Sequence, residues 1–309
     1  MSAPAGANCG PRPARLRTVL CTCGGLYGAL VLRRLRACER LDVCAVVRSS
    51  RVLDPSFGFM QGALGQIRRS GVGYALFLWC TTTLADWCCA WNAIGAVPAR
   101  SVDRKPRVLI TRDINDPQGL QFVADSTPDL LVSAFFNQRL RAPALALPKL
   151  ACLNIHPSLL PEAKGVDPVF QALRTGAPLG VTVHFMTPEL DAGGILAQRI
   201  VETRPGASVF EATALCFREG AELLAAAIDR VVAGERGKPQ SGAGSYQSWP
   251  TSAEVAALHA RGGALARAID FVRLLGGRLP RKALGPRGPG SRPRDRVKCP
   301  IPVRGRPFH

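Results

Sequence analysis

Short apolar runs alternate with amphipathic segments along much of this 309-residue chain. The first run, Thr18–Cys23, is followed by two glycines and by a helical pattern over Leu26–Cys38. A second run, Asp42–Val47, predicts another strand. This order of strand, turn, helix and strand is typical of the opening of a doubly wound α/β domain. The first helix could cradle an anion at its N-terminus, or its glycines could serve only a tight turn.

The same alternation resumes beyond residue 98 and continues to residue 233. Expected strands lie at Val108–Ile110, Leu130–Ala134, Ala151–Ile155, Val181–Met186 and Ile195–Val201, and expected helices at Asp116–Asp125, Arg139–Leu147, Pro168–Arg174 and Ser208–Ala233. The unbroken apolar run at Leu130–Ala134 suits a strand buried on both faces. The pattern therefore predicts an α/β, doubly wound, Rossmann-like domain over residues 18–233.

Residues 52–98 interrupt this alternation and predict a mainly helical insertion. Within it, Gly73–Pro98 carries Asp86 as its only charge and is about long enough to span a bilayer. A central acid and modest aliphatic content argue against a spanning helix. Two interpretations stay open: a buried structural element, and peripheral contact of 73–98 with a membrane through its tryptophans.

The alternation of strands and helices ends after the long helix predicted over Ser208–Ala233. Residues 234–277 predict a linker and a short helical segment that starts near Pro250-Thr251, which leaves no room for a β-rich second domain. Residues 278–309 hold ten Lys or Arg, one acid and many Pro and Gly, and so contribute half of the net charge of +18. This composition predicts a disordered basic tail. The tail could attract phosphates of nucleic acid or lipid, or could be merely solubilising.

Cysteine spacing and the N-terminus favour a cytoplasmic protein. The eleven cysteines form no CxxC pair and the four histidines do not lie near them, so no metal site is expected. Free thiols suit a reducing compartment. Residues 1–13 lack the apolar core of a signal peptide.

Candidate chemistry begins at the end of the predicted strand 151–155. Asn154 and His156 are two residues apart, so their side chains share one face of that strand. Open α/β sheets bind ligands at the carboxyl ends of their strands. Asp191 follows in a loop before another strand and could reach the same crevice. An amide, an imidazole and a carboxylate suit oxyanion stabilisation and proton transfer, although each could also be structural.

The residues around these three form a longer pattern. It runs through Asn154, His156, Ser158-Leu159-Leu160-Pro161, Gly165, Pro168, Gly180-Val181-Thr182, Leu190-Asp191 and Gly193. This pattern resembles the signature of the folate-dependent formyltransferases, and within that family it is most similar to the methionyl-tRNA and amino-sugar enzymes. The resemblance implies 10-formyltetrahydrofolate as co-substrate and no metal.

The resemblance also implies roles for the three residues. Asn154 would hold the formyl oxygen and later the oxyanion. His156 would assist as imidazolium and serve as general acid. Asp191 would pair with His156 and raise the pKa of that imidazole above its ordinary value of about 6.5.

Two segments would bind the folate by the same resemblance. The segment that wraps the pterin comprises Phe136, Asn137, Gln138, Arg139 and Leu140, and a second wall comprises Ser158, Leu159, Leu160 and Pro161. Core packing is the alternative for the apolar members. The histidine within VTVHF, His184, is expected to be a satisfied structural residue. Tyr246–Thr251 would correspond to the segment that closes over the site.

The acceptor is predicted to be a primary amine, on methionyl-tRNA or on a diverged acceptor such as an amino-sugar nucleotide. The basic charge suits tRNA, but Glu162 stands where the tRNA enzymes usually carry a basic residue. Two alternatives stay open. One is hydrolysis of formyltetrahydrofolate, and the other is a non-catalytic protein of the same fold that binds nucleic acid or membrane.

Overall fold

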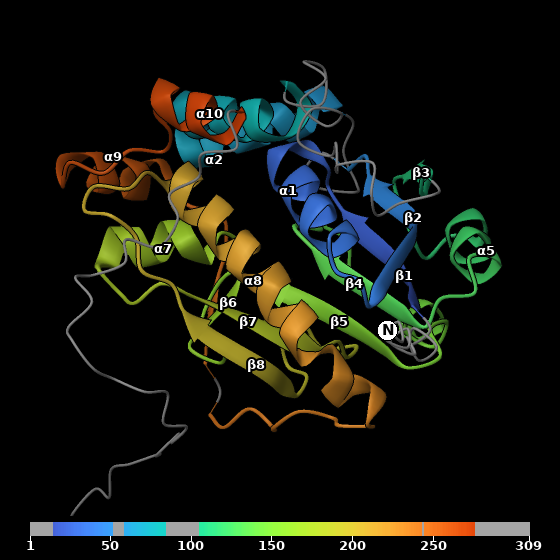
Figure 1. Ribbon diagram of the computed structural model, residues 1–309. Helices are drawn as coiled ribbons and strands as arrows, with labels where there is room; N and C mark the ends of the chain where they lie inside the picture. Colours follow the sequence, from blue (N-terminus) through green and yellow to red (C-terminus); the bar gives the residue numbers. More distant parts are fainter. Residues whose placement is uncertain (1–14, 52–58, 85–104, 243, 276–309) are drawn as a thin grey trace, which may run out of the picture. The chain divides into compact units, whose positions relative to one another are not determined.

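The computed structural model describes residues 15–51, 59–84, 105–242 and 244–275, and its centre is a mixed sheet (Figure 1). The strands are β1 (Leu16–Thr22), β2 (Leu41–Ser49), β3 (Arg107–Thr111), β4 (Leu130–Ala134), β5 (Ala151–His156), β7 (Gly180–Phe185) and β8 (Ile195–Ile200). Their order across the sheet is β3-β2-β1-β4-β5-β7-β8. The strands from β3 to β5 run parallel, whereas β7 is antiparallel to both β5 and β8.

Helices cover both faces of this sheet, as a doubly wound fold requires. They are α1 (Gly25–Arg36), α5 (Pro117–Asp125), α6 (Ala142–Leu145), α7 (Pro168–Thr175) and α8 (Val209–Val232). Because side chains alternate along a strand, Leu20 of β1 joins the core beneath α1 and α8, while Val19 and Cys21 join the core that includes residues of α5 and α6. Figure 1 shows α8 crossing in front of β5, β7 and β8. The predicted fold class is confirmed.

The expected strands and the long helix agree with the structure to within a few residues, but the helix predicted over 139–147 is too long at both ends. Only Ala142–Leu145 is helical there. The Asn115 side chain binds the carbonyl of Arg139 at 2.9 Å and the N–H of Arg141 at 2.7 Å. These bonds, made from outside the segment, hold 139–141 in a non-helical conformation.

The described part of the insertion is helical, as predicted. It consists of α2 (Phe59–Trp79), which breaks at Gly71, and one π-helical stretch, η1 (Cys80–Leu84). Residues 52–58 and 85–98 lie outside the described residues. No helix among the residues described is long and apolar enough to cross a membrane.

One face of α2 docks against the domain. Tyr74 is fully buried and its ring meets those of Phe170 on α7 and Trp249 at centroid distances of 5.9 and 6.4 Å. The buried Ser70 hydroxyl donates to the Pro250 carbonyl. On this face the expectation of a buried structural element holds.

The C-terminal segment contains a short strand and two helices. They are β9 (Ser245–Gln247), α9 (Ser252–Ala260) and α10 (Ala268–Leu275). Thr251 and Glu254 form a capping box that begins α9 where the sequence predicted it. Strand β9 pairs with β6 (Ala163–Gly165). No apolar pattern in the sequence predicted this pairing. The predicted tail, 278–309, lies outside the described residues, and the seven cysteines within the described part are free thiols.

The closest approach of α8 to the sheet generates a stability prediction. A Cβ at Gly220 would lie 2.3 Å from Ile155 and 2.7 Å from Val181, whereas a Cβ at Gly65 on α2 meets nothing within 4 Å. We expect Gly220→Ala to lower the free energy of unfolding by about 1–3 kcal/mol through overpacking. Gly65→Ala should be neutral or raise it by up to about 1 kcal/mol. Denaturant titration of both variants measures this, and equal effects would contradict the packing argument.

Candidate active site

Three predicted residues come together at the end of β5. Asn154 and His156 are paired across the antiparallel β5–β7 ladder with His184 and Thr182. Asp191 lies in the loop between β7 and β8, where its carboxylate Oδ1 is 3.6 Å from Nδ1 of His156 and 3.7 Å from Nε2 of His184. The structure therefore gathers an amide, two imidazoles and a carboxylate at the carboxyl end of the last parallel strand.

The orientation of His156 is fixed by a backbone carbonyl. Its ring is buried, and Nε2 lies 3.0 Å from the carbonyl oxygen of Ala163, to which it donates. The Ser158 hydroxyl donates to the same oxygen at 2.6 Å. With Nε2 held in this way, Nδ1 is the nitrogen that faces Asp191.

Asp191 is held by both its side chain and its backbone. Its Oδ2 accepts a hydrogen bond from the N–H of Gly165 at 3.1 Å, and its own carbonyl accepts one from the Gln240 amide at 2.8 Å. The side chain is only 13% exposed. A carboxylate removed from water to this degree needs compensating donors, and the Gly165 N–H supplies one.

His184 also belongs to this cluster. Its Nδ1 lies 2.8 Å from the Phe185 carbonyl and donates to it, so its Nε2 is the acceptor for the Asn154 amide at 3.1 Å. Burial, and next the charge of His156, lower the pKa of His184 to about 4, against the opposing effect of Asp191. The imidazole is satisfied, as expected from the sequence, but it also orients Asn154. That contact could not be found from the sequence because the β5–β7 register is non-local.

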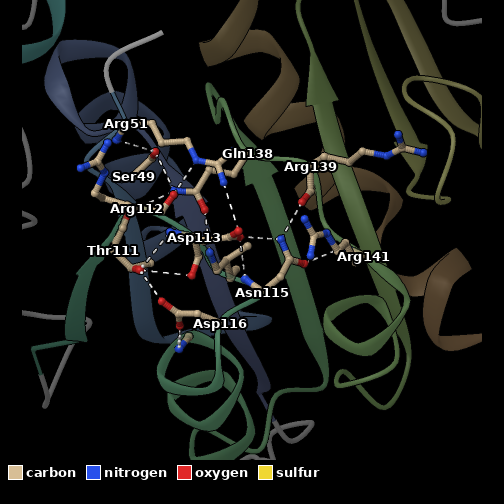
Figure 2. A network of polar contacts seen from close by, with 12 residues as sticks. Ser49, Arg51, Thr111, Arg112, Asp113, Asn115, Asp116, Gln138, Arg139 and Arg141 are labelled. Atoms are coloured by element: carbon tan, nitrogen blue, oxygen red, sulfur yellow. Dashed lines mark hydrogen bonds and ion pairs between the residues drawn. The ribbon is translucent and has the colours of Figure 1, made fainter. Parts of the chain in front are cut away.

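The predicted pterin segment is tied into the fold by its own side chains. The buried Gln138 accepts from the N–H of Ile114 at 2.7 Å and donates to Ser49 and to the Thr111 carbonyl (Figure 2). Leu140 is buried in the core. Gln138 and Leu140 therefore stabilise the segment, and its contact with folate stays a prediction.

The other members of this segment hold neighbouring loops. Phe136 packs against the core that includes residues of α5 and α6, and the Asn137 amide donates to the Arg51 carbonyl at 3.0 Å. The Arg139 guanidinium donates to the Pro188 carbonyl at 2.7 Å. This bond joins the predicted pterin segment to the loop that carries Asp191.

A cavity of about 320 Å³ adjoins the same segment. It is lined by Arg51, Asp113, Asn115, Arg139, Leu140, Arg141, Ala142 and Pro188, and not by Asn154, His156 or Asp191. Burial raises the pKa of Asp113, but hydrogen bonds from Asn115 and the charges of Arg51 and Arg141 outweigh it and lower the pKa. With three arginines and one acid, the cavity has a positive excess that suits an anionic ligand group.

The second predicted wall, 158–161, is partly structural. The Leu160 N–H donates to the Thr182 hydroxyl at 3.1 Å and its side chain is buried. The half-buried Leu159 side chain lies against Gly180, and the Leu160–Pro161 peptide bond is cis. The positions therefore flank His156, and folate contact by this wall stays a prediction.

The N-terminus of α1, the alternative anion site, is covered by the insertion. A Cβ at Gly25, whose φ is +62°, would lie 2.2 Å from the carbonyl oxygen of Thr81 in η1. The Arg48 side chain packs against Gly24. The glycines therefore serve a tight turn that permits this close packing. Within the residues described, no group of three or more His, Cys, Asp or Glu could hold a metal ion.

A hydrogen bond links the insertion to the loop that supports Asp191. The Tyr74 hydroxyl donates to Oδ2 of Asp167 at 2.6 Å, and Oδ1 of Asp167 accepts from the N–H of Phe170, which caps α7. Two residues before Asp167, the N–H of Gly165 donates to Asp191. Sequence reasoning missed this link because its partners are 93 residues apart.

This link predicts the effect of Tyr74→Phe. Its removal leaves the half-buried Asp167 with one donor fewer, so we expect the free energy of unfolding to fall by about 1–3 kcal/mol. Tyr246→Phe, at a tyrosine that is 60% exposed, is the matched control and should change little. Chemical denaturation of both variants decides, and an unchanged midpoint for Tyr74→Phe would show that the bond carries no net stability.

The environment of His184 predicts a pH dependence of stability. Its pKa of about 4 in the folded chain lies below the ordinary value of about 6.5, so between these values the unfolded chain binds the proton more readily. Stability should therefore fall by a few kcal/mol as the pH drops from about 6.5 to about 4. His184→Asn should flatten this part of the profile relative to wild type, whereas substitution of the exposed His259 should not. Unfolding free energies measured across this range test the sign, and an equal slope in both variants would refute it.

Part of the chain is similar in sequence to known formyltransferases. Residues 92–228 match the model of the formyl transferase family. The methionyl-tRNA formyltransferase of Roseiflexus castenholzii is 40% identical over 128 residues, which are 41% of this chain and 41% of that protein. The chain thus spans about two fifths of the length of the curated relatives it matches.

Solved structures with similar folds include two formyltransferases. Glycinamide ribonucleotide transformylase 1 from Symbiobacterium toebii is 19% identical with a TM-score of 0.49, over 77% of this chain and 100% of that one. A 4-N formyltransferase from Francisella tularensis is 19% identical with a TM-score of 0.47, over 75% and 76%. Residues 92–228, which match the formyl transferase family, include Asn154, His156 and Asp191.

Proposed function

We propose that this chain transfers a formyl group from 10-formyltetrahydrofolate to a primary amine. The observation that carries the proposal is the buried cluster at the end of β5, in which Asp191 faces His156 and His184 orients Asn154. The cluster lies within the segment matched by the formyl transferase family.

The proposed reaction passes through a tetrahedral intermediate. The amine nitrogen attacks the formyl carbon, and the carbonyl oxygen gains negative charge. One N–H of the Asn154 amide is used by His184, so the other is available to that oxygen. Protonated His156 would add positive charge beside it.

Breakdown of the intermediate requires one proton to be added to the folate nitrogen and one to be removed from the attacking amine. The C–N bond to the folate breaks, and its nitrogen takes up a proton from His156. The attacking amine loses a proton, which Asp191 collects directly or through a water. The distance of 3.6 Å between Nδ1 of His156 and Oδ1 of Asp191 supports an exchange of protons between these steps.

The donor would lie along the two predicted walls. Backbone groups of 136–140 would contact the pterin, and 158–161 would form the opposite wall. The neighbouring cavity, with Arg51, Arg139 and Arg141, suits the carboxylates of the donor's glutamate tail.

Features of the chain bear on the acceptor in opposite directions. Similarity to methionyl-tRNA formyltransferases over two fifths of their length and a net charge of +18 favour Met-tRNA. Glu162 favours a diverged acceptor such as an amino-sugar nucleotide. Water in place of the amine would make the chain a hydrolase with the same three residues.

Incubation of the full chain with 10-formyltetrahydrofolate and a panel of acceptors tests the proposal. Met-tRNA, amino-sugar nucleotides and water alone are compared, and product mass identifies the formylated species. A formylated amine supports the proposal, release of formate without an acceptor supports the hydrolase, and no consumption of donor in any arm rejects both.

Substitutions in the cluster sharpen the test. We expect His156→Asn and Asp191→Asn to lower kcat by a factor on the order of 10²–10³, the loss typical of one transition-state contact, with unchanged circular dichroism. His259→Asn and Asp125→Asn, at exposed positions, are the matched controls and should retain activity. Normal turnover by either cluster variant would reject the assigned roles.

A further inference from the structure

The outer face of α2 exposes large apolar side chains. We define this face by Met60, Leu64, Ile67, Val72, Leu76 and Trp79, whose exposure runs from 37% for Ile67 to 76% for Met60. Six of the fourteen large exposed hydrophobic residues in the described part of the chain lie on this one helix. Scattered apolar residues are normal on a surface, but such a concentration marks an interaction site.

The spacing of these residues is that of an amphipathic helix. In each half of α2, on either side of the break at Gly71, the exposed residues follow an i, i+4, i+7 pattern. In the second half these are Val72, Leu76 and Trp79. Each half therefore turns one apolar stripe outward.

The opposite face is already occupied. Gln66, Ser70 and Tyr74 are buried there, with hydrogen bonds from Gln66 to Ser70, from Ser70 to Pro250 and from Tyr74 to Asp167. Because Pro250 and Asp167 lie outside α2, the last two bonds fix the rotation of α2 about its axis. The outer face cannot turn into the core of its own domain without breaking both of them.

The charges beside the outer face indicate which kind of partner it binds. Residues 59–84 contain no acid, and Arg68, on the flank of this face next to Ile67, is exposed, as is Arg69 farther round the helix. Helices that lie on bilayers with anionic headgroups share three features. They have apolar side chains that enter the interface, a tryptophan and neighbouring basic residues. An acidic protein surface would match the arginines but not six exposed apolar side chains.

We propose that the outer face of α2 docks on a membrane surface that carries anionic lipid headgroups, with the helix in the plane of the interface. This binding is independent of the proposed formyl transfer. It would hold the domain at the membrane through the same helix whose Tyr74 contacts Asp167 beside the candidate active site. An acceptor at the membrane surface would then meet the site without a separate anchor.

Co-sedimentation of the full chain with vesicles tests this docking. Vesicles of phosphatidylcholine with phosphatidylglycerol should bind the chain, and vesicles of phosphatidylcholine alone should bind it more weakly. Leu64→Asp and Leu76→Asp should each lower the partition coefficient about tenfold or more, because an acid replaces an inserted apolar side chain. Arg68→Glu should weaken binding to the anionic vesicles by a similar factor.

Matched controls keep the test specific. Ile110→Asp, at a residue of the edge strand β3 that is 59% exposed, introduces the same charge away from α2 and should leave binding unchanged. Unfolding midpoints of all variants show whether the fold is retained, and binding is compared only among folded variants.

Four outcomes would overturn the proposal. The first is absence of binding to anionic vesicles, and the second is an equal loss of vesicle binding with Ile110→Asp. The third is complete loss of vesicle binding on removal of residues 276–309, with no effect of the α2 variants. The fourth is a dimer in sedimentation velocity that Leu76→Asp dissociates, while the chain does not bind vesicles. The last would assign the face to a second copy of the chain.

Discussion

The carboxylate of Asp191 is the constraint on which the candidate site depends. It is only 13% exposed, and a charge so far removed from water must be matched by nearby donors. The Gly165 N–H supplies one, and the rings of His156 and His184 flank the other oxygen. The short β6–β9 sheet holds Gly165 in position, and thereby the C-terminal segment takes part in holding the carboxylate.

Two histidines beside one carboxylate need not have the same role. His184 donates through Nδ1 and accepts from Asn154 through Nε2, so its hydrogen bonds define a neutral tautomer. Its burial, followed by the charge of His156, lowers its pKa to about 4 and makes it a poor proton carrier at neutral pH. His156 instead donates through Nε2 to Ala163 and turns Nδ1 to Asp191. His184 is therefore a fixed acceptor, and under the proposed function the proton chemistry falls to His156.

The sequence predicts those parts of this arrangement that depend on local pattern. Apolar runs located the strands, and period two placed Asn154 and His156 on one face of β5. The structure depends equally on non-local pairings that no local pattern encodes. The antiparallel register brings His184 to Asn154, and the side chain of Asn115 keeps residues 139–141 out of the helix expected over 139–147. Three-residue strands such as β6 and β9 are too short to have a periodic signal.

The insertion shows why composition alone left its role open. Residues 59–84 are apolar on two faces, so their periodicity predicts a helix but does not tell which face meets protein. Tyr74 identifies the face that meets protein, because its ring packs against α7 and its hydroxyl donates to Asp167. The other face then has its large apolar side chains held in solvent by the same contacts. A helix added only to fill space would have no need of that second stripe, because exposing it costs free energy that a polar face would avoid. Its retention beside exposed arginines is what an interface with lipid explains and core packing does not.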